Sequence, residues 1–98
     1  MAEFFDPTIG NLESSIARSS KIQETIAHNI ANAQTPGYVA KVFDNELNKA
    51  VEREDSKTVK LEEEMAEMSK NSTRHSAYVK LLTQKLGMLR TIVTQGRK

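Results

Sequence analysis

The clearest pattern in the chain is a heptad of apolar positions in its C-terminal part. Positions separated alternately by four and three residues form one stripe: Leu61, Met65, Met68, Ser72, His75, Val79, Leu82, Leu86, Leu89 and Val93. This spacing predicts a helix over 58–95 with a coiled-coil seam. A second, shorter stripe of Tyr78, Leu81, Met88 and Ile92 widens the apolar face near the C-terminal end.

A second helix is predicted near the N-terminus, over 7–34. Its apolar positions recur at helical spacing: Ile9, Leu12, Ile16, Ile22, Ile26 and Ile30. Asp6 supplies an N-cap acceptor immediately before Pro7, whose fixed φ suits the first position of a helix. The two helices therefore present apolar faces that can pack against each other.

The first helix is expected to end shortly before Pro36. Proline keeps the preceding Thr35 out of the α region, and Thr35-Pro36-Gly37-Tyr38 has the residues of a type II turn, with glycine where φ must be positive. The chain should reverse direction there.

The segment between the helices has a weaker pattern. Val42, Phe43, Leu47, Ala50 and Val51 fit one face of a short helix, and the charged run over 52–57 fits a solvated loop. With two prolines, four glycines, no tryptophan and few β-branched clusters, a sandwich or barrel is excluded. The expected fold is all-α: two long unequal helices forming an antiparallel coiled-coil hairpin, with a turn and a short irregular or helical middle segment.

The expected organisation is a single domain, 1–98, comprising the helix over 7–34, a turn and loop over 35–57 and the helix over 58–95. At 1.5 Å per residue the two helices are about 40 Å and about 55 Å long, so the shorter cannot cover the longer. The stripe of Leu81, Met88 and Ile92 would then be exposed in a monomer, and exposed apolar patches mark interaction surfaces.

Polar residues interrupt both stripes near their middles. Ser19 and Gln23 in the first helix can face Ser72 and His75 in the second, as polar layers fix the register of coiled coils. We predict such a register-setting contact.

Charge is segregated along the chain although the net charge is only +1. Residues 44–67 are acidic, whereas residues 69–98 carry seven bases and no acid. A helix with acids in its first turns and bases toward its end suits the macrodipole, and a basic surface for nucleic acid is the alternative. The N-terminal residues lack the features of a cleaved Sec signal, and no apolar run approaches the ~20 residues that span a bilayer.

The sequence offers little catalytic chemistry. Cysteine is absent, and neither His28 nor His75 belongs to a cluster with metal-ligand spacing. His75 and the nearby Met65 and Met68 fit core positions better than a metal site. No enzyme, cofactor, metal site or small-molecule substrate is expected.

One segment is similar to a known signature. Its matching residues are Asn29, Ile30, Ala31, Asn32, Thr35, Pro36, Gly37 and Tyr38. This run resembles the N-I-A-N-x-x-T-P-G-Y motif of the axial proteins of the bacterial flagellum, found in rod, hook and hook-associated subunits. The run over 61–72 and its continuation through 85–92 are similar to the proximal subunits of the basal-body rod in particular.

The resemblance implies a structural rod subunit that is exported without a cleaved signal peptide and polymerises as a homo-oligomer in a periplasmic helical tube. It implies contacts with other rod subunits, the rod-to-ring junction protein, the membrane ring and the export gate. The signature residues would end the inner helix and turn the chain outward, and Asn29 and Asn32 would cap backbone carbonyls or bond a neighbouring subunit. The residues expected to carry helix packing and assembly are Ile9, Leu12, Ile16, Ile26, Leu61, Met65, Met68, Val79, Leu82, Leu86, Leu89 and Val93.

Two alternatives of other classes remain at this stage. The exposed stripe also suits a helical adaptor or export chaperone that binds a partner's amphipathic helix. A nucleic-acid-binding helix pair built on residues 69–98 ranks third, because its bases are spread out rather than clustered.

Overall fold

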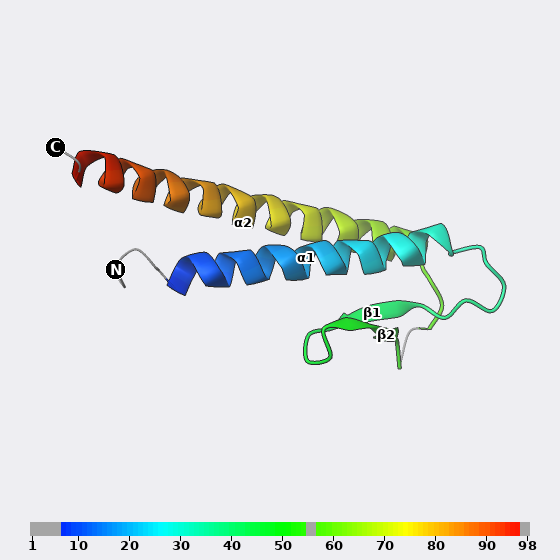
Figure 1. Ribbon diagram of the computed structural model, residues 1–98. Coiled ribbons are helices and arrows are strands. Elements are labelled where there is room, and N and C mark those ends of the chain that lie inside the picture. Colours follow the sequence, from blue (N-terminus) through cyan, green and yellow to red (C-terminus); the bar gives the residue numbers. More distant parts are fainter. Residues whose placement is uncertain (1–6, 55–56, 97–98) are drawn as a thin grey trace.

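The computed structural model describes residues 7–54 and 57–96. Along the chain these form α1 (Pro7–Ala31), β1 (Lys41–Asp44), β2 (Lys49–Glu52) and α2 (Leu61–Gly96). Figure 1 shows the two helices lying side by side and antiparallel, with the two strands beside the C-terminal half of α1. The molecule is elongated, measuring 65 × 24 × 16 Å. The two predicted helices are therefore present, while the predicted N-cap Asp6 lies outside the described residues.

The end of α1 is shaped by polar side chains and a glycine. The Asn32 side-chain amide donates to the His28 carbonyl at 2.9 Å, and the Thr35 hydroxyl donates to Asn32 Oδ1 at 3.1 Å. The backbone N–H of Tyr38 then donates to the Thr35 carbonyl at 3.2 Å, closing a turn in which Gly37 has φ 79°. A positive φ costs glycine little, which is why this position carries it. The predicted turn is present.

The middle segment corrects the expectation of an all-α chain. It forms an antiparallel β-hairpin in which Val42 pairs with Val51 and Phe43 with Ala50. Asp44 Oδ1 accepts the backbone N–H groups of Glu46 at 2.8 Å and Leu47 at 3.1 Å. Asn48 follows in the left-handed region with φ 55°, which asparagine tolerates better than most residues. The apolar residues that fit a short helix instead alternate across two strands joined by this turn.

The β-hairpin is attached to both helices. Ala40, just before β1, is fully buried; its N–H donates to the Lys57 carbonyl at 2.8 Å and its carbonyl accepts the N–H of Arg53 at 2.9 Å. These bonds join the residue before β1 to the segment that follows β2 and leads into α2. The start of α2 is thereby held close to the end of α1.

Polar pairs set the register of the two helices. Ser19 Oγ lies 2.5 Å from His75 Nδ1, and the Asn71 side-chain amide donates to Gln23 Oε1 at 2.8 Å. The predicted polar layer is therefore present with one change, because Asn71 and not Ser72 faces Gln23. In both pairs the two residue numbers add to the same value, so the start of α1 lies level with residue 87 of α2. The last turns of α2 extend past α1, as Figure 1 shows.

The seam on α2 differs from the predicted one. The residues turned toward α1 are buried or half-buried: Glu64, Met68, Asn71, His75, Tyr78, Leu82, Lys85 and Leu89. Four of these residues belong to the predicted stripe, namely Met68, His75, Leu82 and Leu89. The six other members of that stripe are exposed: Leu61, Met65, Ser72, Val79, Leu86 and Val93. The predicted stripe is therefore divided: the column that contains Met68, Leu82 and Leu89 faces α1, whereas the column that contains Met65, Val79 and Leu86 lies along one side of the helix pair. The polar pairs and the buried carboxylate of Glu64 turn α2 away from its more apolar column.

The enclosed core is small. On α1, Leu12 and Ile26 are buried while Ile9 and Ile16 are half-buried. Within residues 7–54 and 57–96, the buried hydrophobic side chains are Leu12, Ile26 and Ala40. Leu81, Met88 and Ile92 are exposed, as the helix lengths predicted. None of the helices in these ranges is long and apolar enough to cross a membrane.

Candidate functional site: a buried polar junction and an exposed helix face

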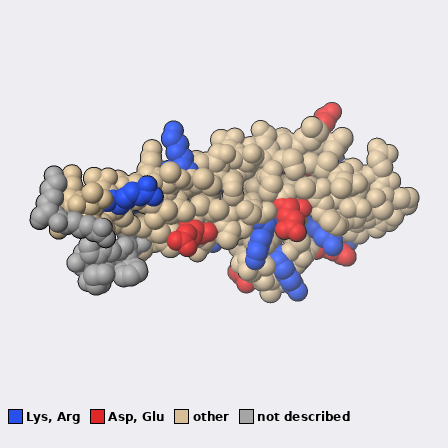
Figure 2. Space-filling view, turned by 45° about the horizontal axis from the view of Figure 1, so that its top comes forward, with Lys and Arg blue, Asp and Glu red and all other residues tan. Residues whose placement is uncertain are grey.

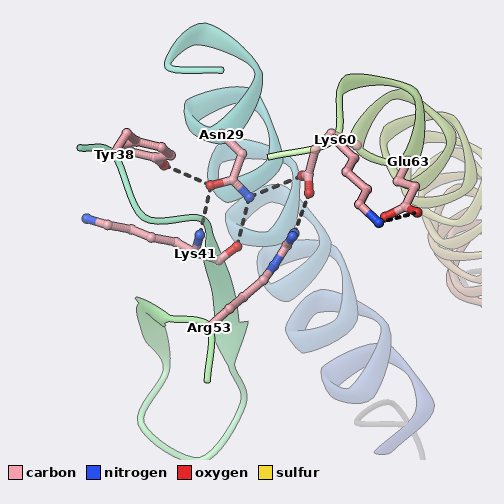
Figure 3. A network of polar contacts seen from close by, with 7 residues as sticks. Asn29, Tyr38, Lys41, Arg53, Lys60 and Glu63 are labelled. Atoms are coloured by element: carbon pink, nitrogen blue, oxygen red, sulfur yellow. Dashed lines mark hydrogen bonds and ion pairs between the residues drawn. The ribbon is translucent and has the colours of Figure 1, made fainter. Parts of the chain in front are cut away.

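Asn29 is the centre of a polar junction that joins α1, β1 and α2 (Figure 3). Its side chain is fully buried. The amide nitrogen donates to the Lys41 carbonyl at 2.8 Å and to Glu64 Oε2 at 3.1 Å, while Oδ1 accepts the Lys41 N–H at 2.9 Å. By bonding both backbone groups of Lys41, Asn29 acts as the hydrogen-bonding neighbour of the first residue of β1. The signature asparagine thus fixes where the β-hairpin leaves the helix.

Glu64 brings a charge into the junction from the first turn of α2. Its side chain is 2% exposed, and its other carboxylate oxygen, Oε1, is paired with the guanidinium of Arg53. A buried carboxylate is tolerated only where it is paired and hydrogen-bonded, and Arg53 and Asn29 together meet that condition. The junction therefore connects α2 to the strand end as well as to α1.

Tyr38 closes the junction from the signature turn. Its hydroxyl donates to Asn29 Oδ1 at 2.8 Å, so the 2.9 Å contact with His28 Nδ1 requires the histidine nitrogen to be the donor. Burial raises the pKa of Tyr38 above its ordinary value of 10.0, the Glu64 carboxylate raises it further, and Arg53 opposes them. Burial and the Glu64 carboxylate both favour the neutral phenol, and only the neutral phenol can donate the hydrogen bond to Asn29 Oδ1.

The polar layer in the middle of the helix pair forms a second cluster. The Ser19 hydroxyl donates to the Ile16 carbonyl at 2.9 Å, so its short contact with His75 must be donated by His75 Nδ1. The Asn71 amide also donates to the Ser19 carbonyl at 2.8 Å, whereas its buried Oδ1 has no hydrogen-bond partner within the described residues. This layer fixes the register and costs stability, because a buried acceptor is left unpaired.

An exposed apolar face runs along α2 on the side of the seam. It consists of the five apolar residues of the predicted stripe that α1 leaves uncovered: Leu61, Met65, Val79, Leu86 and Val93. Leu81 and Met88 lie on the opposite side of the seam and are also exposed. In the view of Figure 2, more charged side chains lie in the right half of the molecule than in the left half, and uncharged surface separates them. Surface of this kind is typical of a protein that is covered by others.

The structure brings only part of the predicted site together. Of the signature residues, Asn29, Asn32, Thr35 and Tyr38 make side-chain hydrogen bonds; Ile30 is half-buried, and Ala31, Pro36 and Gly37 are exposed. Sequence reasoning missed Glu64, Arg53 and Asn71. Arg53 and Glu64 were hidden within charged runs, where no sequence signal separates a buried ion from a solvated one.

Within the described ranges, the histidine and acidic side chains form no group of three that could hold a metal ion. The distinctive features of the described residues are structural: a hydrogen-bonded turn, a buried polar junction and a helix pair with exposed apolar sides. The fold and the site thus define an elongated structural protein built for assembly.

Comparisons with known proteins agree with this class. The family model described as flagella basal body rod protein matches residues 11–38, which include α1 from its second turn onward and the whole signature turn. The chain is also 27% identical, over 126 aligned residues, to the flagellar basal body rod protein FlgB of Bacillus subtilis (strain 168), covering 95% of this chain and 98% of that protein. The chain is thus similar to flagellar basal body rod proteins over most of its length, and this similarity supports the role of a structural rod subunit. The resemblance predicted from the signature is confirmed.

The relative is longer than this chain. The alignment extends over 126 residues, whereas this chain has 98, so the relative carries residues that this chain lacks. Between α1 and α2 this protein has only the turn and one small β-hairpin.

Proposed function

We propose that the protein polymerises through its two helices into the proximal part of the flagellar rod. The single observation that carries the proposal is the apolar face of α2, where Leu61, Met65, Val79, Leu86 and Val93 are exposed although they belong to the heptad stripe of this helix. A heptad that its own chain does not cover is a seam for another helix. In this proposal the antiparallel pair is a coiled-coil hairpin that becomes fully packed only within the rod.

The assembly partners follow from that position. Copies of this chain and other rod subunits lie beside α2 in a helical tube, the rod-to-ring junction protein and export gate lie at its base, and the membrane ring surrounds it. The rod is periplasmic, and the subunit reaches it through the flagellar export apparatus without a cleaved signal peptide. The subunit is therefore required for flagellum assembly and for motility. It acts without catalysis, cofactor, small-molecule substrate or nucleic acid.

The junction around Asn29 has a defined part in this function. A rod subunit must present its helices and its outer segment at a fixed angle, because every copy repeats the same contacts. Asn29, Glu64 and Arg53 hold the β-hairpin to both helices at one place. The β-hairpin is then the outward-facing part of the subunit.

The proposal is tested by deleting the coding sequence in the source bacterium and restoring it with a tagged copy. The expected result is loss of swimming and of hook-basal bodies in the deletion strain, recovery of both on complementation, and copurification of the tag with isolated basal bodies.

Copurification with one soluble partner in a complex of fixed size, with basal bodies free of the tag, would instead support the adaptor or chaperone. A deletion strain that swims normally would contradict the proposal directly.

A further inference from the structure

A small open cavity lies between α1 and the β-hairpin, where Figure 1 shows the strands beside the C-terminal half of the helix. Its lining residues come from α1, from both strands and from the turn that joins them. The cavity has a volume of about 270 Å³, whereas sites for drug-sized ligands occupy about 300–1,000 Å³. A space of this size suits one side chain or one small molecule.

Three lysines from three different elements line this cavity: Lys21 of α1, Lys41 of β1 and Lys49 of β2. None of the three makes an ion pair with another described residue. Figure 3 shows the Lys41 side chain extending away from Asn29, although the backbone groups of Lys41 bond Asn29. The fold thus brings three unpaired ammonium groups to one place.

The acidic residues nearby do not neutralise these lysines. Asp44 is the cross-strand neighbour of Lys49, but its Oδ1 accepts two backbone N–H groups of the hairpin turn. Glu24 is the single acid in the lining, and it makes no ion pair with a described residue. Three lysines against one glutamate leave an excess of two positive charges while His28 is neutral.

The cavity also has an apolar wall. Phe43 of β1 lies directly across from Ala50 of β2, and both line the cavity. Thr25 is buried, and its hydroxyl donates to the Lys21 carbonyl at 2.9 Å, so this donor is already used within α1. Apolar walls beside charged groups concentrate the field of those charges. A ligand that fits has an apolar part for the strands and an anionic end for the lysines.

We propose that this cavity binds a carboxylate group carried on a short apolar stem. Lys21, Lys41 and Lys49 hold the carboxylate, while Phe43 and Ala50 contact the stem. Glu24 disfavours a ligand with a second negative charge, such as a phosphate dianion, because like charges repel. The carboxylate comes from an acidic side chain of another protein or from a free short-chain carboxylic acid. This site goes beyond the proposed assembly role, since it uses neither α2 nor a second copy of the chain.

The ligand chemistry is tested by titrating the full-length chain, labelled with nitrogen-15, and recording its amide spectrum. With 4-methylpentanoate we expect saturable shifts of the Phe43, Lys49 and Ala50 amide signals, with a dissociation constant in the millimolar range. The uncharged 4-methylpentanamide has the same stem, and it should bind about tenfold more weakly because the charge-assisted hydrogen bonds are lost. Inorganic phosphate, which lacks the stem, should also bind more weakly, and high salt should weaken binding of 4-methylpentanoate.

Substitutions in the lining should change the affinity for 4-methylpentanoate in opposite directions. Lys21→Gln and Lys49→Gln should each weaken binding about threefold, since both lysines are exposed to solvent. Glu24→Gln should strengthen binding about threefold, because it removes the acid of the lining. Lys80→Gln, exposed on α2, is the matched control and should leave the affinity unchanged. Circular dichroism spectra show whether each variant is folded, and an increase in affinity cannot result from unfolding.

A capped tripeptide with a glutamate between two leucines distinguishes the two sources of the carboxylate. Tighter binding of this peptide than of 4-methylpentanoate identifies an acidic protein side chain, and tighter binding of 4-methylpentanoate identifies a free acid. Equal affinity for the acid and its amide, tighter binding of phosphate, shifts spread over lysines outside the cavity, or no gain from Glu24→Gln would overturn the inference. A chain that copurifies with basal bodies but binds no carboxylate overturns this inference alone.

Discussion

At the scale of single residues, Asn29 makes more contacts that define the fold than any other signature residue. Its buried side-chain amide is hydrogen-bonded to both the N–H and the carbonyl of Lys41 in β1, to the Tyr38 hydroxyl and to the Glu64 carboxylate. Removing it leaves the Lys41 backbone groups and one oxygen of Glu64 without partners in a site closed to water. The cost of the loss is set by these unpaired groups more than by the bonds themselves.

Asn29→Ala should therefore lower the free energy of unfolding by about 3 kcal/mol. Urea denaturation followed by circular dichroism measures this. Asn32→Ala is the control: its bonds to His28 and Thr35 are exposed, and its loss should cost less than about 1 kcal/mol. Equal effects of the two substitutions would show that the junction does not hold the fold together.

Tyr38 gives the junction a dependence on alkaline pH. The pKa of Tyr38 is raised in the folded chain, so an unfolded tyrosine loses its proton near pH 10 while the folded one still holds it. In that interval the unfolded state binds fewer protons, and the free energy of unfolding falls as pH rises toward the folded pKa. Below pH 10 the contribution is fully present.

We predict that Tyr38→Phe shows a shallower decline of the free energy of unfolding above pH 10 than the unsubstituted chain. The informative quantity is the difference between the two pH profiles, because all other groups are common to both chains. Tyr78→Phe, which lies outside the junction, is the matched control and should follow the unsubstituted chain. Identical profiles for all three proteins would rule out the raised pKa.

The sequence identified Asn29 and Tyr38 as special residues but not their partners. The signature drew attention to them through resemblance, whereas nothing in the runs around Arg53 and Glu64 separates them from neighbouring charges. Burial of an ion pair depends on where two distant segments meet. That meeting point is set by the β-hairpin, which the residue pattern concealed.

At the scale of elements, the helices were predictable and the β-hairpin was not. Long periodic stretches specify helices strongly. Val42, Phe43, Ala50 and Val51 lie in runs of only four residues, which fit one helical face as well as two short strands. The left-handed conformation of Asn48, which allows the hairpin turn, is invisible in a list of apolar positions.

The glycines allow a paired test of local conformation. A Cβ at Gly37 or at Gly87 would meet no neighbouring atom within 4 Å, so the backbone alone decides the effect of alanine. Gly37→Ala should lower the free energy of unfolding by about 1 kcal/mol, because φ is 79°. Gly87→Ala should raise it by about 1 kcal/mol, since Gly87 lies within α2.

Thermal unfolding of the two variants measures both effects. The same substitution should thus move the melting temperature in opposite directions. Destabilisation by Gly87→Ala would mean that α2 is not helical around residue 87 in the free chain.

We expect the polar layer between the helices to lower the free energy of unfolding while it fixes the register of α1 against α2. Asn71→Leu removes a buried oxygen that lacks a partner and adds apolar surface, so the free energy of unfolding should rise by about 1 kcal/mol. The bonds that Asn71 makes to Ser19 and Gln23 are lost with it.

The helices of this variant should then occupy more than one register. Distances between spin labels on α1 and α2 measure this, and we expect a broader distribution than in the unsubstituted chain. A less stable variant with an unchanged distribution would contradict the assigned role.

At the scale of the whole molecule, the heptad of α2 describes the packing of the monomer only in part. The heptad predicts a single seam on α2, yet the column that contains Met65, Val79 and Leu86 is exposed beside the seam with α1. Periodicity shows which residues are to be buried but not which molecule buries them. In the proposed function, neighbouring subunits of the rod cover this face, which would explain why a chain with so few enclosed apolar side chains has a long heptad stripe.

The most direct test of this account is the incorporation of a variant carrying Leu86→Arg into the rod. Leu86 is 48% exposed, so arginine at this position should leave the free chain folded, with an unchanged helical circular dichroism spectrum. In the source bacterium the variant should be absent from isolated basal bodies and should fail to restore swimming. Thr91→Arg, exposed on another side of α2, controls for added charge and should incorporate. Normal incorporation of the Leu86→Arg chain would contradict the claim that assembly buries this face.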